Sequence, residues 1–269
     1  MTHRPSLRLL AAVAASACAL LLSSCASTSR QRLASVPYPD GTPRPLIIAE
    51  YRPITLDGDL ADWKGVPFID VTPQTGVFDG ESQSTDCPKD LSYRFALCHD
   101  NDALYVAVRV VDDVLQLDDT AAGETHAKAW MDDAIEVFID GNLNRAPHAR
   151  SADRAEYPSG GEFSLVANGA ATSNCTGWPD SFGKPDYWQG ATAIHPQADG
   201  SVVLTYEYRL TWRVMGGIAG PGSRIGFTIG VQDDDDGGNR DHALYWQGFS
   251  PSCWKDENGW GEVYIKPAK

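Results

Sequence analysis

Residues 104–111 read Leu-Tyr-Val-Ala-Val-Arg-Val-Val, and every second residue, from Leu104 to Val110, is a branched apolar one. Such alternation is typical of a β-strand that buries one face. The same pattern recurs in residues 91–97, 135–139, 202–210, 225–231 and 263–265. Turn residues separate these stretches, and helix signals are weak outside a single turn at 211–215. We therefore predict an all-β fold, an antiparallel β-sandwich of the immunoglobulin or jelly-roll type with little helix.

The N-terminus has the features of a bacterial secretion signal. Arg4 and Arg8 precede an apolar run at residues 9–22, which is too short to span a bilayer as a helix. The run leads through Ser23 and Ser24 to Cys25, and this order resembles the bacterial lipobox. The resemblance implies a lipoprotein signal peptide at 1–24 and acylation of Cys25. An ordinary secretory signal is the alternative.

The rest of the chain divides into a short linker and one domain. Residues 25–44 lack periodicity and contain Ser, Thr and Pro, so we expect a flexible tether. Residues 45–269 are long enough for one β-sandwich with a full core. We expect a location at the bacterial cell envelope, on the outer membrane or the periplasmic face if the host is Gram-negative, with the lipid anchor as the only membrane contact.

The formal net charge of −14 disfavours nucleic acid as a partner. Cys18 falls in the signal and Cys25 is the lipidation site, which leaves four cysteines. An even number outside the cytosol predicts two disulfides, and four cysteines allow three pairings. One arrangement joins Cys87 to Cys98 and leaves Cys175 with Cys253.

Two tryptophans lie among polar loop residues, outside the alternating pattern. Trp130 precedes the strand at 134–140, and Trp254 lies close to the last strand. Two facing indoles could hold a sugar ring between them. Glu136 points away from the face formed by Ile135 and Val137. We expect Trp63, Trp212, Trp246 and Trp260 in the core or at its edge. For Trp178 and Trp188 the sequence leaves both roles open, packing and ligand contact.

An ordered series of motifs resembles the family 9 carbohydrate-binding modules. It begins with Ile-Thr-Leu-Asp-Gly-Asp-Leu-Ala-Asp-Trp at 54–63, continues with Asp-Asn-Asp-Ala-Leu-Tyr-Val at 100–106 and Trp-Met-Asp-Asp-Ala-Ile-Glu-Val-Phe-Ile-Asp at 130–140, and ends with Trp-Gly-Glu-Val at 260–263. The resemblance implies a β-sandwich that is not an enzyme and that binds a polysaccharide or oligosaccharide, with at most an accessory role in carbohydrate catabolism.

The resemblance also implies the site. Trp130 and Trp254 match the family's tryptophan clamp, which holds a terminal sugar of a β-glucan or xylan, and Glu136 matches a glutamate that bonds sugar hydroxyls. We expect no cofactor beyond a structural calcium ion, which some members hold. The acidic run 233–236 is one conceivable place for calcium, although it lacks the spacing of an EF-hand loop.

The chain departs from the family pattern at three positions. Ser164 stands where an arginine is expected, Gly230 where a glutamine is expected, and Pro251 where an asparagine is expected. The residues that read the end of a sugar chain are therefore expected to be largely missing.

Three other functions stay open. A related haem-binding domain would need axial ligands, for which only Met131 and Met215 are candidate methionines in the mature chain. A glycoside hydrolase would need two opposed carboxylates, and Asp132, Asp133 and Glu136 are candidates. The third is a structural envelope lipoprotein whose sugar site has decayed.

Overall fold

The computed structural model describes residues 35–80, 82–145, 159–175 and 181–268. Residues Pro37–Lys269 form one compact unit. The predicted signal peptide, Cys25 and Trp178 lie outside the described residues. Within the described part, none of the helices has the length and apolar character needed to span a membrane.

The predicted all-β fold is confirmed, because the described elements are strands joined by loops and short 3₁₀ turns. One sheet contains β8 (Ala171–Asn174), β7 (Gly160–Val166), β6 (Ala134–Asp140), β11 (Arg224–Asp233) and, along the other edge of β11, β12 (His242–Tyr245) and β13 (Gly261–Ile265). β12 also pairs with β3 (Val77–Phe78).

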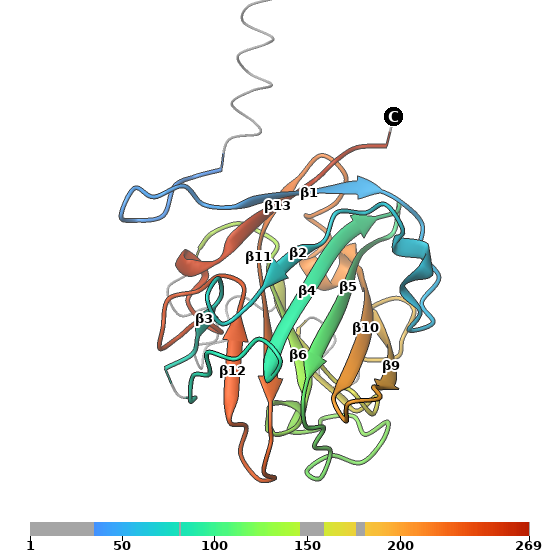
Figure 1. Ribbon diagram of the computed structural model, residues 1–269. Helices are drawn as coiled ribbons and strands as arrows, with labels where there is room; N and C mark the ends of the chain where they lie inside the picture. The colour runs from blue at the N-terminus through green and yellow to red at the C-terminus, as the bar shows by residue number, and fades with distance from the viewer. Residues whose placement is uncertain (1–34, 81, 146–158, 176–180, 269) are drawn as a thin grey trace, which may run out of the picture. The chain divides into compact units, whose positions relative to one another are not determined.

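The second sheet contains β4 (Leu91–His99), β5 (Ala103–Asp112), β10 (Val202–Thr211) and β9 (Trp188–Pro196), with β2 (Ile69–Val71) paired to β4. In Figure 1 these strands lie side by side in front of β6 and β11. The 3₁₀ turns are η1 (Leu60–Trp63), η2 (Ala129–Met131), η3 (Trp212–Met215) and η4 (Glu257–Gly259).

One strand departs from the antiparallel prediction. β1 (Leu46–Tyr51) pairs in parallel with β13 along its first residues and in parallel with β4 at its end. It therefore joins the two sheets, and it lies beside β13 near the top of Figure 1. The remaining strand pairs are antiparallel, as predicted.

The core lies between the two sheets and follows the alternation seen in the sequence. The inward-facing residues of β5 are Leu104, Val106, Val108 and Val110, all fully buried. They pack with Tyr206 and Tyr208 of β10 and, across the core, with the apolar residues of β6 and β11. Trp188 is also buried in the core, so this residue, whose role the sequence left open, is a packing residue.

Glu207 fixes the loop before η1 to the outer face of the second sheet. Its Oε2 accepts hydrogen bonds from the backbone N–H groups of Asp57 and Gly58, and its Oε1 accepts one of 2.8 Å from Trp63 Nε1. Three donors satisfy a fully buried carboxylate. Trp63, Trp246 and Trp260 are buried as predicted, and Trp212 packs at the edge of the core.

The compact domain begins earlier than the predicted boundary at residue 45. Tyr38 donates a hydrogen bond of 2.6 Å from its hydroxyl to Gln247 Oε1. Arg44 is buried, donates to the carbonyl oxygen of Trp260 and lies 3.8 Å from Glu262. The last residues of the expected tether are therefore part of the domain, because the Tyr38 hydroxyl and the buried Arg44 guanidinium bond to residues of the domain.

Candidate functional site

The three predicted site residues line a single cavity of about 610 Å³ over the first sheet. Trp130, Glu136 and Trp254 come from three separate segments of the chain. The other lining residues are Met131, Glu162, Asn174, Asn239, Arg240 and Tyr245. A cavity of this size, with aromatic and polar side chains together, suits a small organic ligand.

The tryptophans lie at the rim of the cavity on short 3₁₀ turns and loops. Trp130 belongs to η2, immediately before β6, and 39% of its surface is exposed. Trp254 follows β12, is half-buried and packs against a cluster that contains Phe138, Tyr245 and Trp260. The Nζ atom of Lys255 lies 4.7 Å from the centre of the Trp254 ring. Exposed indoles at a cavity rim offer apolar faces to a ligand.

Glu136 lies at the floor of the cavity. It points away from the core, as the alternation of β6 predicts, but it is only 4% exposed and is therefore not a solvated surface residue. Its Oε2 accepts hydrogen bonds from Gln232 Nε2 (2.9 Å) and from the hydroxyl of Tyr245 (3.1 Å). Burial, and then the charge of Glu136, raise the pKa of Tyr245 well above its usual value, so this hydroxyl remains a donor.

A second carboxylate and an amide lie beside Glu136. Ser164 is opposite Glu136 in the β6–β7 register, and its hydroxyl lies 3.5 Å from Glu136 Oε1 and 3.3 Å from Glu162 Oε1. Asn174 Nδ2 donates a 2.8 Å hydrogen bond to Glu162 Oε2. The alternation of β7 places Glu162 on the Glu136 face, so the sequence held a signal for it, whereas Asn174 depends on the pairing of β7 with β8.

Two further polar residues come from the loop between β11 and β12. Asn239 and Arg240 line the cavity, and Arg240 Nη2 lies 3.9 Å from Asp79 Oδ2. Sequence reasoning missed both, because no local pattern shows where a loop returns over a sheet. The cavity therefore has a polar ring, built from different residues than those that the family pattern suggested.

The position of Gly230 explains why the chain has no glutamine there, where the family pattern has one. Gly230 lies opposite both Glu136 and Tyr245, and a Cβ atom added there would be 2.6 Å from the Tyr245 ring. The ring takes the space that a larger side chain would need. Gln232, two residues further along the same face of β11, supplies an amide to Glu136 instead.

A cluster of buried carboxylates lies at the last residues of β5 and β11 and immediately before β6. Asp112, Asp133 and Asp233 each offer an oxygen, and these oxygens lie within 4.8 Å of one another. Burial raises the pKa of all three carboxyls, and repulsion from neighbouring carboxylates adds to the increase; the pKa of Asp233 rises to about 10. Three buried acids without a cation are costly to ionise.

Asp233 has the clearest need for a partner, because it is 1% exposed and neither of its carboxylate oxygens has a hydrogen-bond partner within the described residues. A set of oxygen donors without sulfur or nitrogen fits calcium. Asp118, Asp132 and Asp234 form an adjoining group. The acidic run 233–236 therefore supplies only part of the cluster, and Asp112 and Asp133 come from elsewhere.

The structure corrects the disulfide prediction. Cys87, Cys98, Cys175 and Cys253 form no disulfide within the described residues; Cys87 is exposed and the other three are buried. The buried ones lie in three different apolar clusters, and Cys175 Sγ is 3.4 Å from Ser181 Oγ. They pack as small apolar side chains rather than as a crosslink.

The candidate residues for the other functions do not come together. Met131 lines the cavity, whereas Met215 is buried in the core, and no histidine lines this cavity in the described part of the chain. Asp132 accepts hydrogen bonds from Asp119 N and from Thr120 Oγ1, and neither Asp132 nor Asp133 lines the cavity.

A sandwich with an aromatic-rimmed, polar-floored cavity is the architecture of a carbohydrate-binding module. The family model described as "Carbohydrate family 9 binding domain-like" matches residues 63–268. This match covers most of the chain, so the chain belongs to that family, which is one of binding modules.

Solved structures show the same fold. A family 9 module from Caldicellulosiruptor kristjanssonii in complex with cellotriose aligns with a TM-score of 0.60 at 19% identity, over 84% of this chain and 95% of that one. The glucose complex of a family 9 module from the same organism gives 0.61 at 20% identity, over 84% and 97%. A carbohydrate-binding protein, described as putative, from Bacteroides uniformis gives 0.54 at 10% identity, over 83% and 100%.

Among curated proteins, the endo-1,4-beta-xylanase A of Thermotoga neapolitana is 23% identical over 221 residues, which is 81% of this chain and 17% of that protein. The enzyme of the same name from Thermotoga maritima is 24% identical over 177 residues, 66% of this chain and 14% of that protein. The chain thus spans only a small part of these enzymes.

Proposed function

We propose that this protein binds a sugar residue of a β-glycan, xylan or glucan, in the cavity between Trp130 and Trp254. The observation that carries the proposal is that Trp130, Trp254 and Glu136, from three segments of the chain, line one cavity. The sugar complexes of the structural relatives and the xylanase names of the curated ones support this ligand class.

The polar residues have distinct roles in this proposal. The indoles cover the apolar faces of the ring, while Glu136 and Glu162 accept hydrogen bonds from hydroxyl groups and Asn239 and Arg240 donate to ring or hydroxyl oxygens. Gln232 and Tyr245 hold the Glu136 carboxylate in place before the ligand arrives. Preorganisation of this kind lowers the entropic cost of binding.

The expected affinity is modest. Each indole covers on the order of 50 Å² of sugar, which contributes roughly 1 kcal/mol at about 25 cal/mol per Å². Each net hydrogen bond adds about 0.5–1.5 kcal/mol, and association costs offset part of the sum. Dissociation constants between roughly micromolar and millimolar follow.

The same proposal places the module at the cell envelope, without catalytic activity of its own. Its support is the N-terminal sequence, in which a charged start, an apolar run and Cys25 occur in the order of a lipoprotein signal. A lipid-anchored module would keep glycan fragments close to the cell and so assist enzymes that degrade them.

The acidic cluster fits a structural calcium ion. Asp112, Asp133 and Asp233 would hold it, and its charge would offset the repulsion among these buried carboxylates. Because Asp133 lies immediately before β6, which carries Glu136, a bound ion would also stabilise the η2 segment on which Trp130 lies.

Isothermal titration calorimetry against xylan, β-glucan and mannan oligosaccharides tests the proposal. We expect saturable binding to xylan or glucan fragments and none to mannan fragments. No binding to any of these glycans, with the protein folded and calcium present, would contradict it and favour a purely structural envelope protein.

A further inference from the structure

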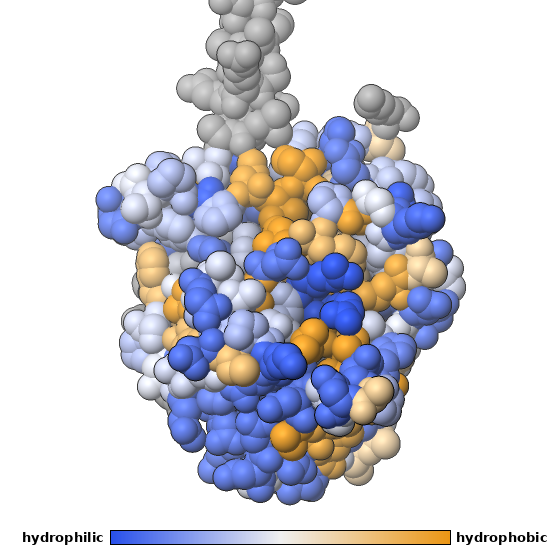
Figure 2. All heavy atoms as spheres, in the orientation of Figure 1, coloured by the Kyte–Doolittle hydropathy of each residue, from blue (hydrophilic) through white to orange (hydrophobic). Residues whose placement is uncertain are grey.

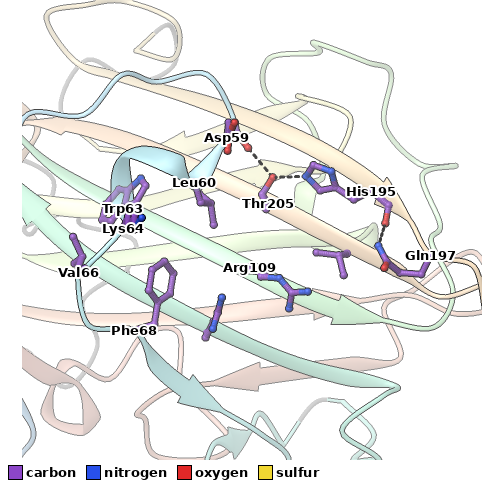
Figure 3. Close-up of a pocket in the computed structure, with 14 residues that line it drawn as sticks. Asp59, Leu60, Trp63, Lys64, Val66, Phe68, Arg109, His195, Gln197 and Thr205 are labelled. Carbon is purple, nitrogen blue, oxygen red and sulfur yellow. Dashed lines mark hydrogen bonds between the residues drawn. The ribbon is translucent and has the colours of Figure 1, made fainter.

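A second cavity, of about 530 Å³, lies on the outer face of the second sheet. Its floor is formed by β4, β5, β10 and β9, and its wall by the segment that contains η1. Figure 3 shows Phe68, Arg109 and His195 around this cavity. Figure 2 shows hydrophilic residues over the middle of β4 and β5, flanked by hydrophobic ones. The proposed β-glycan site, over the other sheet, uses none of these residues.

Two arginines lie side by side on the floor. Arg94 of β4 and Arg109 of β5 are direct partners in the antiparallel register, and Thr205 of β10 continues the row. The Arg94 guanidinium carbon lies 5.0 Å from the centre of the Phe68 ring, which orients it. Like charges directly opposite each other on neighbouring strands are destabilising unless an anion lies between them.

No carboxylate within the residues that the structure describes lies within 4.0 Å of either guanidinium. Asp59 lines the cavity, but its Oδ1 accepts a hydrogen bond of 3.0 Å from Ala61 N. Asp70 is Arg94's other cross-strand partner, both side chains are exposed, and their charged atoms are more than 4.0 Å apart. Burial, and then the charge of Arg94, lower the pKa of Arg109.

The charge of this cavity is opposite to that of the chain. Lys64, Arg94 and Arg109 line it with Asp59 as the single acid among the lining residues, whereas the formal net charge of the chain is −14. General solubility does not account for a local positive cavity on an acidic protein. Arginine pairs favour planar or tetrahedral oxyanions, which they hold with paired hydrogen bonds.

Hydrogen bonds join the wall of the cavity to its floor. Gly58 N donates to Glu207 Oε2 at 2.7 Å, and Thr205 Oγ1 donates to Gly58 O at 2.8 Å. His195 Nε2 lies 3.1 Å from Thr205 Oγ1. These contacts tie the wall to the floor, so the cavity exists before any ligand binds.

The rest of the lining is mixed in character. The apolar residues are Leu60, Trp63, Val66, Phe68 and Val203, and the neutral polar ones include Gln197 and Thr205. Apolar surface beside amide and hydroxyl groups suits a sugar ring, and the arginine pair suits a carboxylate. We propose that this second cavity binds an acidic sugar residue, a uronate, whose carboxylate lies between the guanidinium groups of Arg94 and Arg109.

The test compares methyl glucuronide and methyl galacturonide with methyl glucoside, by calorimetry or ligand-observed NMR at low salt. We expect saturable binding of a uronate, weakening at high salt, and at least tenfold weaker binding of the neutral glucoside. Sulfate and phosphate serve as competitors, and displacement of the uronate by either supports the oxyanion chemistry.

Arg109→Gln and Arg94→Gln should each weaken uronate binding at least tenfold, and Arg109→Lys should weaken it less. Arg213→Gln removes an exposed arginine outside the cavity and should leave it unchanged. Unchanged melting temperatures and unchanged β-glycan binding show that the variants fold. Trp130→Ala and Trp254→Ala, which change only the proposed β-glycan site, should spare uronate binding, and this separates the two proposals.

Three results would overturn the proposal: no saturable uronate binding, binding that Arg94→Gln and Arg109→Gln leave intact, or binding of the inorganic anions without any uronate.

Discussion

Gln232 Nε2 donates a 2.9 Å hydrogen bond to Glu136 Oε2, across the neighbouring strands β11 and β6. The Tyr245 hydroxyl donates to the same oxygen. All three side chains are buried. Two donors on one carboxylate oxygen hold Glu136 in a single orientation at the floor of the cavity, where a ligand would meet it.

Replacement of Gln232 by Ala should weaken glycan binding about fivefold to tenfold, because Glu136 loses one of the donors that orient it. It should also lower the free energy of unfolding by about 1–3 kcal/mol, the usual cost of losing a buried partner. Calorimetry and urea unfolding measure the two effects. Gln74→Ala, at an exposed loop position, is the matched control, and equal effects of both changes would contradict this role of Gln232.

Gly230→Ala tests the space taken by Tyr245. An added Cβ would lie 2.6 Å from the Tyr245 ring, so the ring must move and the floor of the cavity must change. We expect a loss of about 1–3 kcal/mol in the free energy of unfolding, as for overpacked cores, together with weaker glycan binding. At Gly220, where the nearest atom would be 4.0 Å away, the same change should have little effect. Normal binding by the Gly230 variant would show that Tyr245 does not position Glu136.

Chelation of calcium with EGTA should lower the melting temperature by roughly 5–10 °C, because binding that stabilises by about 2–3 kcal/mol shifts Tm by about 2–4 °C per kcal/mol in a domain of this size. Added calcium should restore it. Asp233→Asn should abolish the response, whereas the exposed Asp70→Asn should retain it. A melting temperature that is indifferent to both calcium and EGTA would show that the acidic cluster holds no ion.

The thiols provide a test of the corrected cysteine assignment. In the native protein a thiol reagent should react rapidly with Cys87 and slowly with Cys98, Cys175 and Cys253, because burial excludes the reagent and raises the pKa of the Cys98 and Cys253 thiols to about 12. Mass spectrometry of the labelled peptides measures the order in which the four thiols react. Recovery of disulfide-linked peptides from non-reduced protein would contradict the structure.

The sequence predicted the sandwich because alternation determines which face of each strand is buried. Leu104 and Val108 face the core for this reason, and Glu136 faces away from it. The parallel pairing of β1 left no such signal, because parallel and antiparallel strands alternate in the same way.

The site was only partly predictable. Trp130 and Trp254 stood out as aromatic residues in polar loops, but Asn239 and Arg240 reach the cavity through the path of a loop. The sequence did not show that Gln232 supplies the amide expected at position 230, because both residues lie on one face of β11. Only the position of the Tyr245 ring decides between them. The acidic cluster likewise joins Asp112, Asp133 and Asp233 from distant segments.

A tryptophan-fluorescence titration with xylan and β-glucan oligosaccharides tests whether Trp130 and Trp254 hold a sugar between them. The wild-type protein should show a saturable change in emission. Trp130→Ala and Trp254→Ala should each weaken binding about tenfold or more, while Trp212→Ala, at the edge of the core, should alter stability but not affinity. Wild-type affinity in both rim variants would contradict the clamp.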